Sequence, residues 1–204
     1  MAMLETLVEH DFDARDLERV LSVLGEHPER GLADKVAAAQ DMVEHDRDAQ
    51  DIGRVLRALG EYPEKELAGL VTTVRGQVEH GVDAKDIVRV LRALGACSKH
   101  ELAATLATVQ RMVEHDVDAK DIQRILRALG ACPGQALTGA ASVVEKLVEN
   151  GVDAKDIERV LRALGEHPEQ ELAGMVAAVQ SMVEDGMGAE DIEKSVRARG
   201  AYAR

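Results

Sequence analysis

The fold is decided by the segment Asp153-Ala-Lys-Asp-Ile-Glu-Arg-Val-Leu-Arg-Ala-Leu-Gly165. The same segment returns with small changes every 35 residues, without an insertion or a deletion. A fixed period of roughly 20–50 residues is the signature of a stacked repeat array. The sequence therefore predicts one tandem array, whose other copies of the segment begin at Asp13, Asp48, Asp83, Asp118 and Gly188.

Each copy of the segment predicts one helix, which we call helix A. Asp83 fits the N-cap position, where its carboxylate accepts hydrogen bonds from backbone N–H groups that have no partner inside the helix. Gly95 fits the left-handed position that ends many helices. Between them, an apolar stripe follows the i, i+3, i+4, i+7 spacing of one helix face and consists of Ile87, Val90, Leu91 and Leu94.

A second helix, which we call helix B, follows helix A in each repeat. Its first helical position suits proline, which lacks the N–H that this position leaves unpaired, and the prolines are Pro28, Pro63, Pro133 and Pro168. Helix B has its own apolar stripe, for example Leu172, Val176, Val179 and Val183. Short loops make neighbouring helices antiparallel, so each repeat is a helical hairpin that buries its stripes by stacking on the next. We therefore expect an all-α solenoid of about six hairpin repeats.

The two ends of the expected single domain, residues 1–204, depart from the repeat. Residues 1–12 match only the last part of helix B and predict a half-helix that caps the array. Residues 188–204 form a degenerate last repeat, in which Ser195 and Arg199 replace apolar residues of the stripe. Polar residues there would be costly beneath another repeat, so they favour an open superhelix with a C-terminal cap over a closed ring.

Composition limits the classes of function. Apolar residues form 46% of the 204-residue chain, which is ample for a core. The formal net charge of −13 disfavours unassisted binding to nucleic acid or to an anionic membrane. No apolar run reaches the roughly 18 residues of a membrane span, and the N-terminus lacks the features of a secretory signal. We expect a cytoplasmic protein that does not engage a membrane.

No pattern indicates catalysis, a cofactor or a metal. One histidine recurs per repeat at the end of helix B, a spacing of roughly 10 Å that is too wide for one metal centre. We interpret these residues as caps that favour the negative end of the helix dipole; they are His10, His45, His80 and His115. Motifs of nucleophilic enzymes, phosphate loops and zinc sites are missing. Cys97 and Cys132 lie one repeat apart, too far for a disulfide, and predict two buried or half-buried thiols.

Basic residues concentrate on helix A, on the face opposite the apolar stripe. They form a candidate binding ribbon of Arg54, Arg57, Lys85, Arg89, Arg92, Lys120, Arg124, Arg127, Lys155, Arg159 and Arg162. One interpretation is a solvated face balanced by i, i+3 ion pairs such as Asp86 with Arg89. The other is a binding surface for an acidic partner.

The loop between helix A and helix B differs between copies while its flanks hardly change. Its candidate variable positions are Glu26, His27, Glu61, Tyr62, Ala96, Cys97, Ala131, Cys132, Glu166 and His167. Exposed loop tips vary freely when nothing constrains them. The functional interpretation is one recognition element per repeat along one edge of the array.

Two stretches resemble known helical repeats. Lys85-Asp-Ile-Val-Arg-Val, followed by a loop and His100-Glu-Leu, resembles the unit of bacterial TALE-like repeats. Gly151-Val-Asp-Ala-Lys-Asp-Ile-Glu-Arg-Val-Leu is similar to mitochondrial termination factor repeats. The first resemblance implies a helix–loop–helix unit that reads DNA with two variable loop residues.

Our expectation for function is a non-enzymatic scaffold that binds a protein partner. The alternative is a TALE-like modular array that binds nucleic acid with the helix A ribbon and the variable loops. A further alternative is an engineered or purely structural repeat protein without a partner, for which the regular spacing is the only indication.

Overall fold

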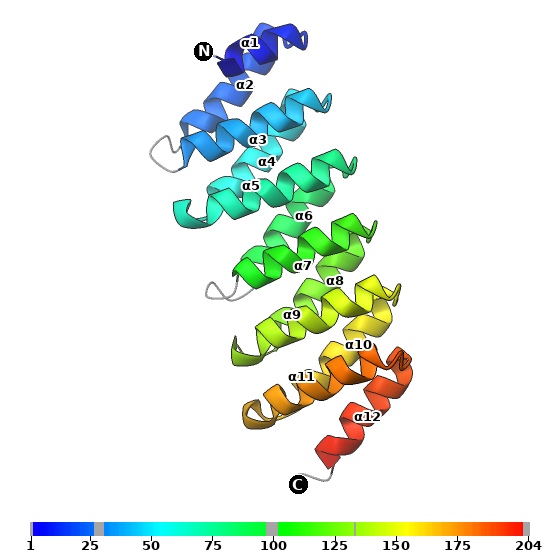
Figure 1. The fold of residues 1–204 in the computed structure, drawn as a ribbon. Coiled ribbons are helices and arrows are strands. Elements are labelled where there is room, and N and C mark those ends of the chain that lie inside the picture. The colour runs from blue at the N-terminus through cyan, green and yellow to red at the C-terminus, as the bar shows by residue number, and fades with distance from the viewer. Residues whose placement is uncertain (1, 27–30, 97–101, 133, 202–204) are drawn as a thin grey trace. The chain divides into compact units, whose positions relative to one another are not determined.

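The structure, a computed structural model, describes residues 2–26, 31–96, 102–132 and 134–201. Within these ranges all regular structure is α-helical and no strand occurs (Figure 1). The A helices are α2 (Ala14–Gly25), α4 (Ala49–Gly60), α6 (Ala84–Gly95), α8 (Ala119–Gly130), α10 (Ala154–Gly165) and α12 (Ala189–Ala201). The B helices are α1 (Ala2–Glu9), α3 (Leu32–Glu44), α5 (Glu64–Glu79), α7 (Leu102–Glu114), α9 (Gly134–Glu149) and α11 (Glu169–Glu184).

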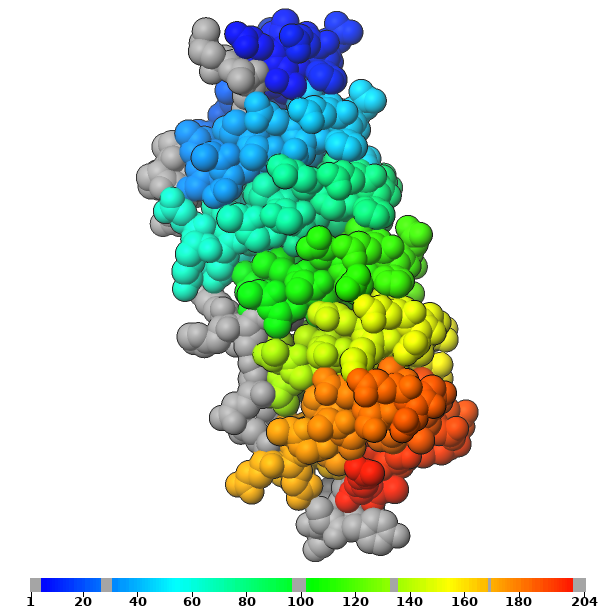
Figure 2. Space-filling view, in the orientation of Figure 1, coloured from blue at the N-terminus to red at the C-terminus, as the bar shows by residue number. Residues whose placement is uncertain are grey.

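The chain divides into two compact units, residues 1–92 and residues 93–204. In the first unit α2 packs on α4, and α1, α3 and α5 pack in that order. In the second unit α8, α10 and α12 form one row, and α7, α9 and α11 form the other. Neighbouring B helices such as α9 and α11 lie directly side by side (Figure 2). Within each unit these helices thus pack on the equivalent helix of the next repeat, which confirms the predicted all-α, solenoid-like array.

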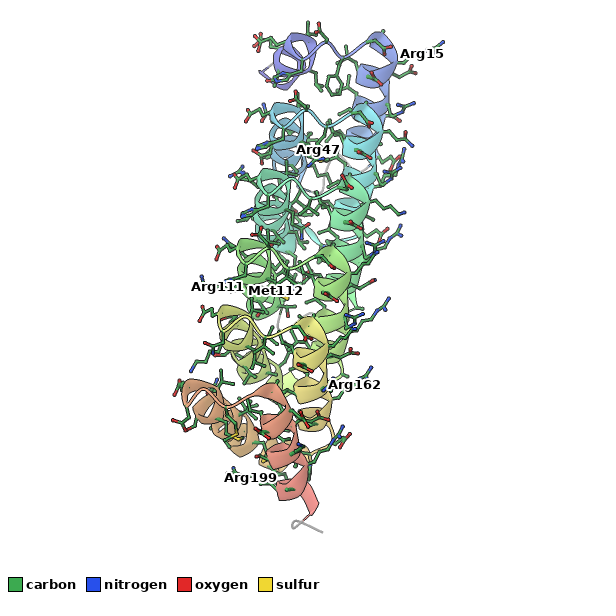
Figure 3. All side chains as sticks on the ribbon, turned by 90° about the vertical axis from the view of Figure 1, so that its right-hand side faces the viewer. Arg15, Arg47, Arg111, Met112, Arg162 and Arg199 are labelled. Carbon is green, nitrogen blue, oxygen red and sulfur yellow. The ribbon has the colours of Figure 1, made fainter. Side chains whose placement is uncertain are left out.

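The core lies between the rows and consists of the predicted stripes. Every residue of the α6 stripe, from Ile87 to Leu94, is buried, and so are Leu172 and Val179 of α11. Met112 of α7 points between the two rows of the second unit and is fully buried (Figure 3). Because helix A and helix B each contribute an apolar face, a repeat completes its core only by stacking on its neighbours.

The predicted N-caps are confirmed in four repeats, at Asp13, Asp48, Asp118 and Asp153. In α8, for example, one carboxylate oxygen of Asp118 accepts hydrogen bonds from the backbone N–H groups of Lys120 and Asp121, both at 2.9 Å. The capping residue has extended backbone, as an N-cap requires. Each A helix therefore begins where its sequence predicts.

The end of helix A differs from the prediction. Gly60 and Gly165 are the last residues of their helices and are not left-handed. The backbone instead stays right-handed through Glu61 at φ −74°, and the N–H of Tyr62 donates to the carbonyl of Leu59 at 3.1 Å. This right-handed turn carries the Tyr62 side chain towards the next A helix. Left-handed residues follow helix B instead, and they are Asp11, Asp46, Gly81, Asp116, Gly151 and Gly186.

The prolines are also shifted by one position from the prediction. Pro63 and Pro168 are N-cap residues, because their ψ angles of 146° and 144° are extended and not helical. Helix B then begins at Glu64 and at Glu169. Pro28 and Pro133 lie outside the described residues.

The N-terminal half-helix has the predicted position as α1, and α12 is the last A helix. In α12 Ser195 is half-buried and Arg199 is exposed. The capping role of these ends and the open superhelix stay predictions. Among the described residues, no helix combines the length and the apolar character that crossing a membrane requires.

Candidate binding surface on helix A

The first arginine of the ribbon in each repeat is paired within its own helix. Arg54 binds Asp51 at 2.6 Å and Arg159 binds Asp156 at 3.0 Å, three residues earlier in both helices. The same ion pair joins Arg19 to Asp16, Arg89 to Asp86 and Arg124 to Asp121. The predicted i, i+3 pairs are therefore confirmed, and they neutralise this part of the ribbon.

The remaining cations of the ribbon are more accessible. Arg162 is bound to Glu158 at 2.6 Å, one turn earlier in α10. In the view of Figure 3 it extends from α10 on the side away from the B helices. The others are exposed and have no ion pair with another residue that the structure describes; they are Arg57, Lys85, Arg92, Lys120, Arg127 and Lys155.

In the second unit the ribbon borders a groove between α8 and α10, with a volume of about 470 Å³. We call it the α8–α10 groove. Two alanines form part of its wall, and its polar lining consists of Lys120, Gln123, Arg124, Arg127, Glu158 and Arg162. The lining thus contains four basic side chains and one carboxylate, and two of the cations, Arg124 and Arg162, are already ion-paired.

Glu158 connects the two helices that form the groove. One of its carboxylate oxygens accepts a hydrogen bond from Arg162, and the other lies 3.5 Å from Nε of Arg124 in α8. The Glu158 side chain is only 20% exposed. It therefore holds two arginines of successive repeats in place, while Lys120 and Arg127 have no acidic partner among the described residues.

Sequence reasoning missed the position that Glu158 occupies. The equivalent residues in the other repeats are Glu18, Gly53, Val88, Gln123 and Glu193, and helix A is otherwise nearly constant from the second repeat to the fifth. Gln123 and Glu158 both line the α8–α10 groove. A comparison of the copies position by position would have found this site, because the second to fifth repeats carry four chemically different residues there.

The second residue of the A–B loop is buried, in contrast to the expected exposed recognition element. The hydroxyl of Tyr62 donates to the carbonyl of Leu91 in α6. His167 Nε2 lies 3.0 Å from the carbonyl oxygen of Val196 in α12, and since a carbonyl only accepts, this nitrogen donates. Both contacts reach a carbonyl 29 residues further along, in helix A of the next repeat.

Cys132 occupies the same loop position and is also buried. Burial raises the pKa of its thiol to about 11, because the surroundings disfavour the thiolate. The free, buried thiol predicted for Cys132 is thus confirmed. The first loop residue is exposed in every repeat that the structure describes, at Glu26, Glu61, Ala96, Ala131 and Glu166. His27 and Cys97 lie outside the described residues.

Three of the four histidines predicted to cap the end of helix B do so by a side-chain hydrogen bond. Nδ1 of His10, His45 and His80 lies 2.8–3.0 Å from the carbonyl oxygen four residues earlier. Because a carbonyl oxygen only accepts, Nδ1 carries the proton in each of them. In the described part of the chain, no three His, Cys, Asp or Glu side chains come together as a metal ion would need.

Comparison with known proteins identifies no relative: no protein-family model, curated protein or solved structure matches this chain.

Proposed function

We propose that this protein is a non-enzymatic helical-repeat scaffold that binds a protein partner through the helix A face. The observation that carries the proposal is the α8–α10 groove, where exposed cations surround a space of about 470 Å³. Arginine is enriched among the residues that dominate protein interfaces. Charge complementarity across such an interface also selects the partner and speeds association.

Three features favour a protein over a nucleic acid. The net charge of −13 repels a long polyanion. The first ribbon arginine of each repeat is bound to an aspartate, which leaves fewer cations for the many phosphate contacts that such binding needs. The buried Tyr62, Cys132 and His167 are not accessible to bases, whereas the TALE-like alternative requires accessible loop residues.

The test is affinity capture with the full chain as bait, with and without nuclease treatment. The ribbon variant is Arg124→Glu/Arg127→Glu. Its control, Arg111→Glu/Lys146→Glu, makes the same change in net charge on helix B. We expect a protein that the wild type and the control capture, that the ribbon variant loses and that nuclease does not release. The purified partner should then bind with the same dependence on the variants.

Two sets of results would contradict the proposed function. Capture that nuclease abolishes, or sub-micromolar binding to duplex DNA at physiological salt that the ribbon variant loses, would establish the nucleic-acid alternative. Equal capture by the ribbon variant and by its control would show that the helix A face does not contact the partner.

A further inference from the structure

We infer that the α8–α10 groove binds an extended acidic segment of a protein, and that the variable residues Gln123 and Glu158 determine which segment it accepts. This inference rests on the proposed function and gives it a site and a partner of defined chemistry.

The charge of the groove points to an anionic ligand. Its lining contains four basic side chains and one acidic side chain, within a chain whose net charge is −13. Among these cations, Lys120 and Arg127 are exposed and have no carboxylate within ion-pair distance among the described residues. A guanidinium such as that of Arg127 suits a carboxylate, because the planar group can bind both of its oxygens.

The size of the groove and its internal carboxylate favour a peptide over a nucleic acid. A volume of about 470 Å³ lies within the usual range for ligand sites, about 300–1,000 Å³. A few side chains of one peptide segment fit such a space. Glu158 places a negative charge within the lining, which an acidic peptide can avoid by placing an uncharged side chain there, whereas every nucleotide of a nucleic acid carries a phosphate.

Like Glu193, which pairs with Arg197 in α12, Glu158 binds the arginine four residues after it. Its carboxylate forms ion pairs with Arg162 and Arg124, so the cations of the groove that are available to a bound acidic segment are Arg127 and Lys120. The equivalent Val88 in α6 is buried and has no charge to offer. Gly53 in α4 has no side chain at this position. Successive repeats therefore present different chemistry at the same register, as a selective surface requires.

The groove is tested with a fluorescent oligo-glutamate peptide and the full chain at physiological ionic strength, measured by fluorescence anisotropy. Arg127→Glu removes a cation from the groove. Arg111→Glu makes the same change in charge on α7, where Arg111 pairs with Glu114 and Glu149. Figure 3 shows Arg111 and Arg162 pointing away from opposite sides of the second unit, so the control lies far from the groove face.

We expect Arg127→Glu to weaken peptide binding by about tenfold or more, the loss that one hydrogen bond to a charged group brings. Arg111→Glu should leave the affinity nearly unchanged. Glu158→Gln should strengthen binding by about threefold, because it removes a like charge from the groove. Circular dichroism of each variant checks that the fold is retained, and an oligo-glutamine peptide should not bind.

Three results would overturn the inference. Equal weakening by Arg127→Glu and Arg111→Glu would show attraction to overall charge and not to the groove. Tighter, Arg127-dependent binding of a single-stranded RNA or a duplex DNA would make nucleic acid the occupant. If the wild type does not bind the peptide, but affinity capture still yields a partner whose binding depends on Arg124 and Arg127, the acidic-segment inference is wrong. The proposed function then stands.

Discussion

The A–B loop and the face of helix A both vary between otherwise similar repeats, and the structure gives them opposite surroundings. Tyr62 and His167 in the loop are buried and bonded to a carbonyl of the next repeat. Gln123 and Glu158 on helix A are half-buried and line an open groove. Variation at the second loop residue changes how two repeats are joined, whereas in our proposal variation on helix A changes which partner binds. Sequence variation alone therefore does not identify a recognition element; accessibility must accompany it.

The largest expected change in stability comes from removing the side chain of a buried loop residue. Tyr62→Ala should lower the free energy of unfolding by about 3–5 kcal/mol, because it removes a buried aromatic ring. Tyr62→Phe retains the ring and loses only the hydrogen bond to Leu91, which should cost about 1 kcal/mol. Urea unfolding followed by circular dichroism measures both. If the free energy of unfolding changes by no more than about 0.5 kcal/mol in both variants, as is typical of a surface residue, the burial of Tyr62 is contradicted.

A second test uses the reactivity of Cys132, in a Cys97→Ser background. A rise in pKa to about 11 from the ordinary thiol value of 9.0 lowers the thiolate fraction at pH 8 by about a hundredfold. Thiol labelling of the folded chain should be slower than that of the urea-unfolded chain by at least this factor. The buried thiol stabilises the fold below its ordinary pKa, and this contribution is lost as the pH rises towards 11. Labelling at the rate of the unfolded chain would contradict the burial of this loop position.

The smallest expected effect concerns the glycine that ends helix A. Gly165 is not left-handed, and an added Cβ there would meet no atom within 4 Å. Gly165→Ala should therefore stabilise the chain by about 0.5–1 kcal/mol, the difference in helix propensity and chain entropy. Gly151→Ala is the matched control and should destabilise, because Gly151 has φ +70°. If thermal unfolding shows Gly165→Ala to be the more harmful change, the described end of helix A is wrong.

The elements of the fold were predictable because their signals are local. The apolar stripe from Ile87 to Leu94 has the period of a helix face, and Asp118 caps the helix that begins directly after it. The Asp51–Arg54 pair also follows from spacing alone. Such features depend on residues within one or two turns, so the sequence of one repeat contains them in full.

The candidate site was predictable only in part, since its main contacts join different repeats. The burial of Tyr62 depends on a carbonyl 29 residues away, which no local pattern reveals. The groove depends on how α8 and α10 pack, and its bridge from Glu158 to Arg124 crosses between them. The variable helix A position was overlooked because the repeat was interpreted by what its copies share, while a surface that distinguishes partners lies where they differ.

The central claim is that helix A, and not the A–B loop, contacts the partner. Two substitutions in the same repeat test this claim. Glu158→Gln removes one negative charge from α10, and Glu166→Gln removes one from the exposed loop residue that follows α10. Anisotropy titration with the oligo-glutamate peptide should show binding about threefold tighter for Glu158→Gln and unchanged for Glu166→Gln. Tighter binding for Glu166→Gln alone would contradict the claim and assign recognition to the loop.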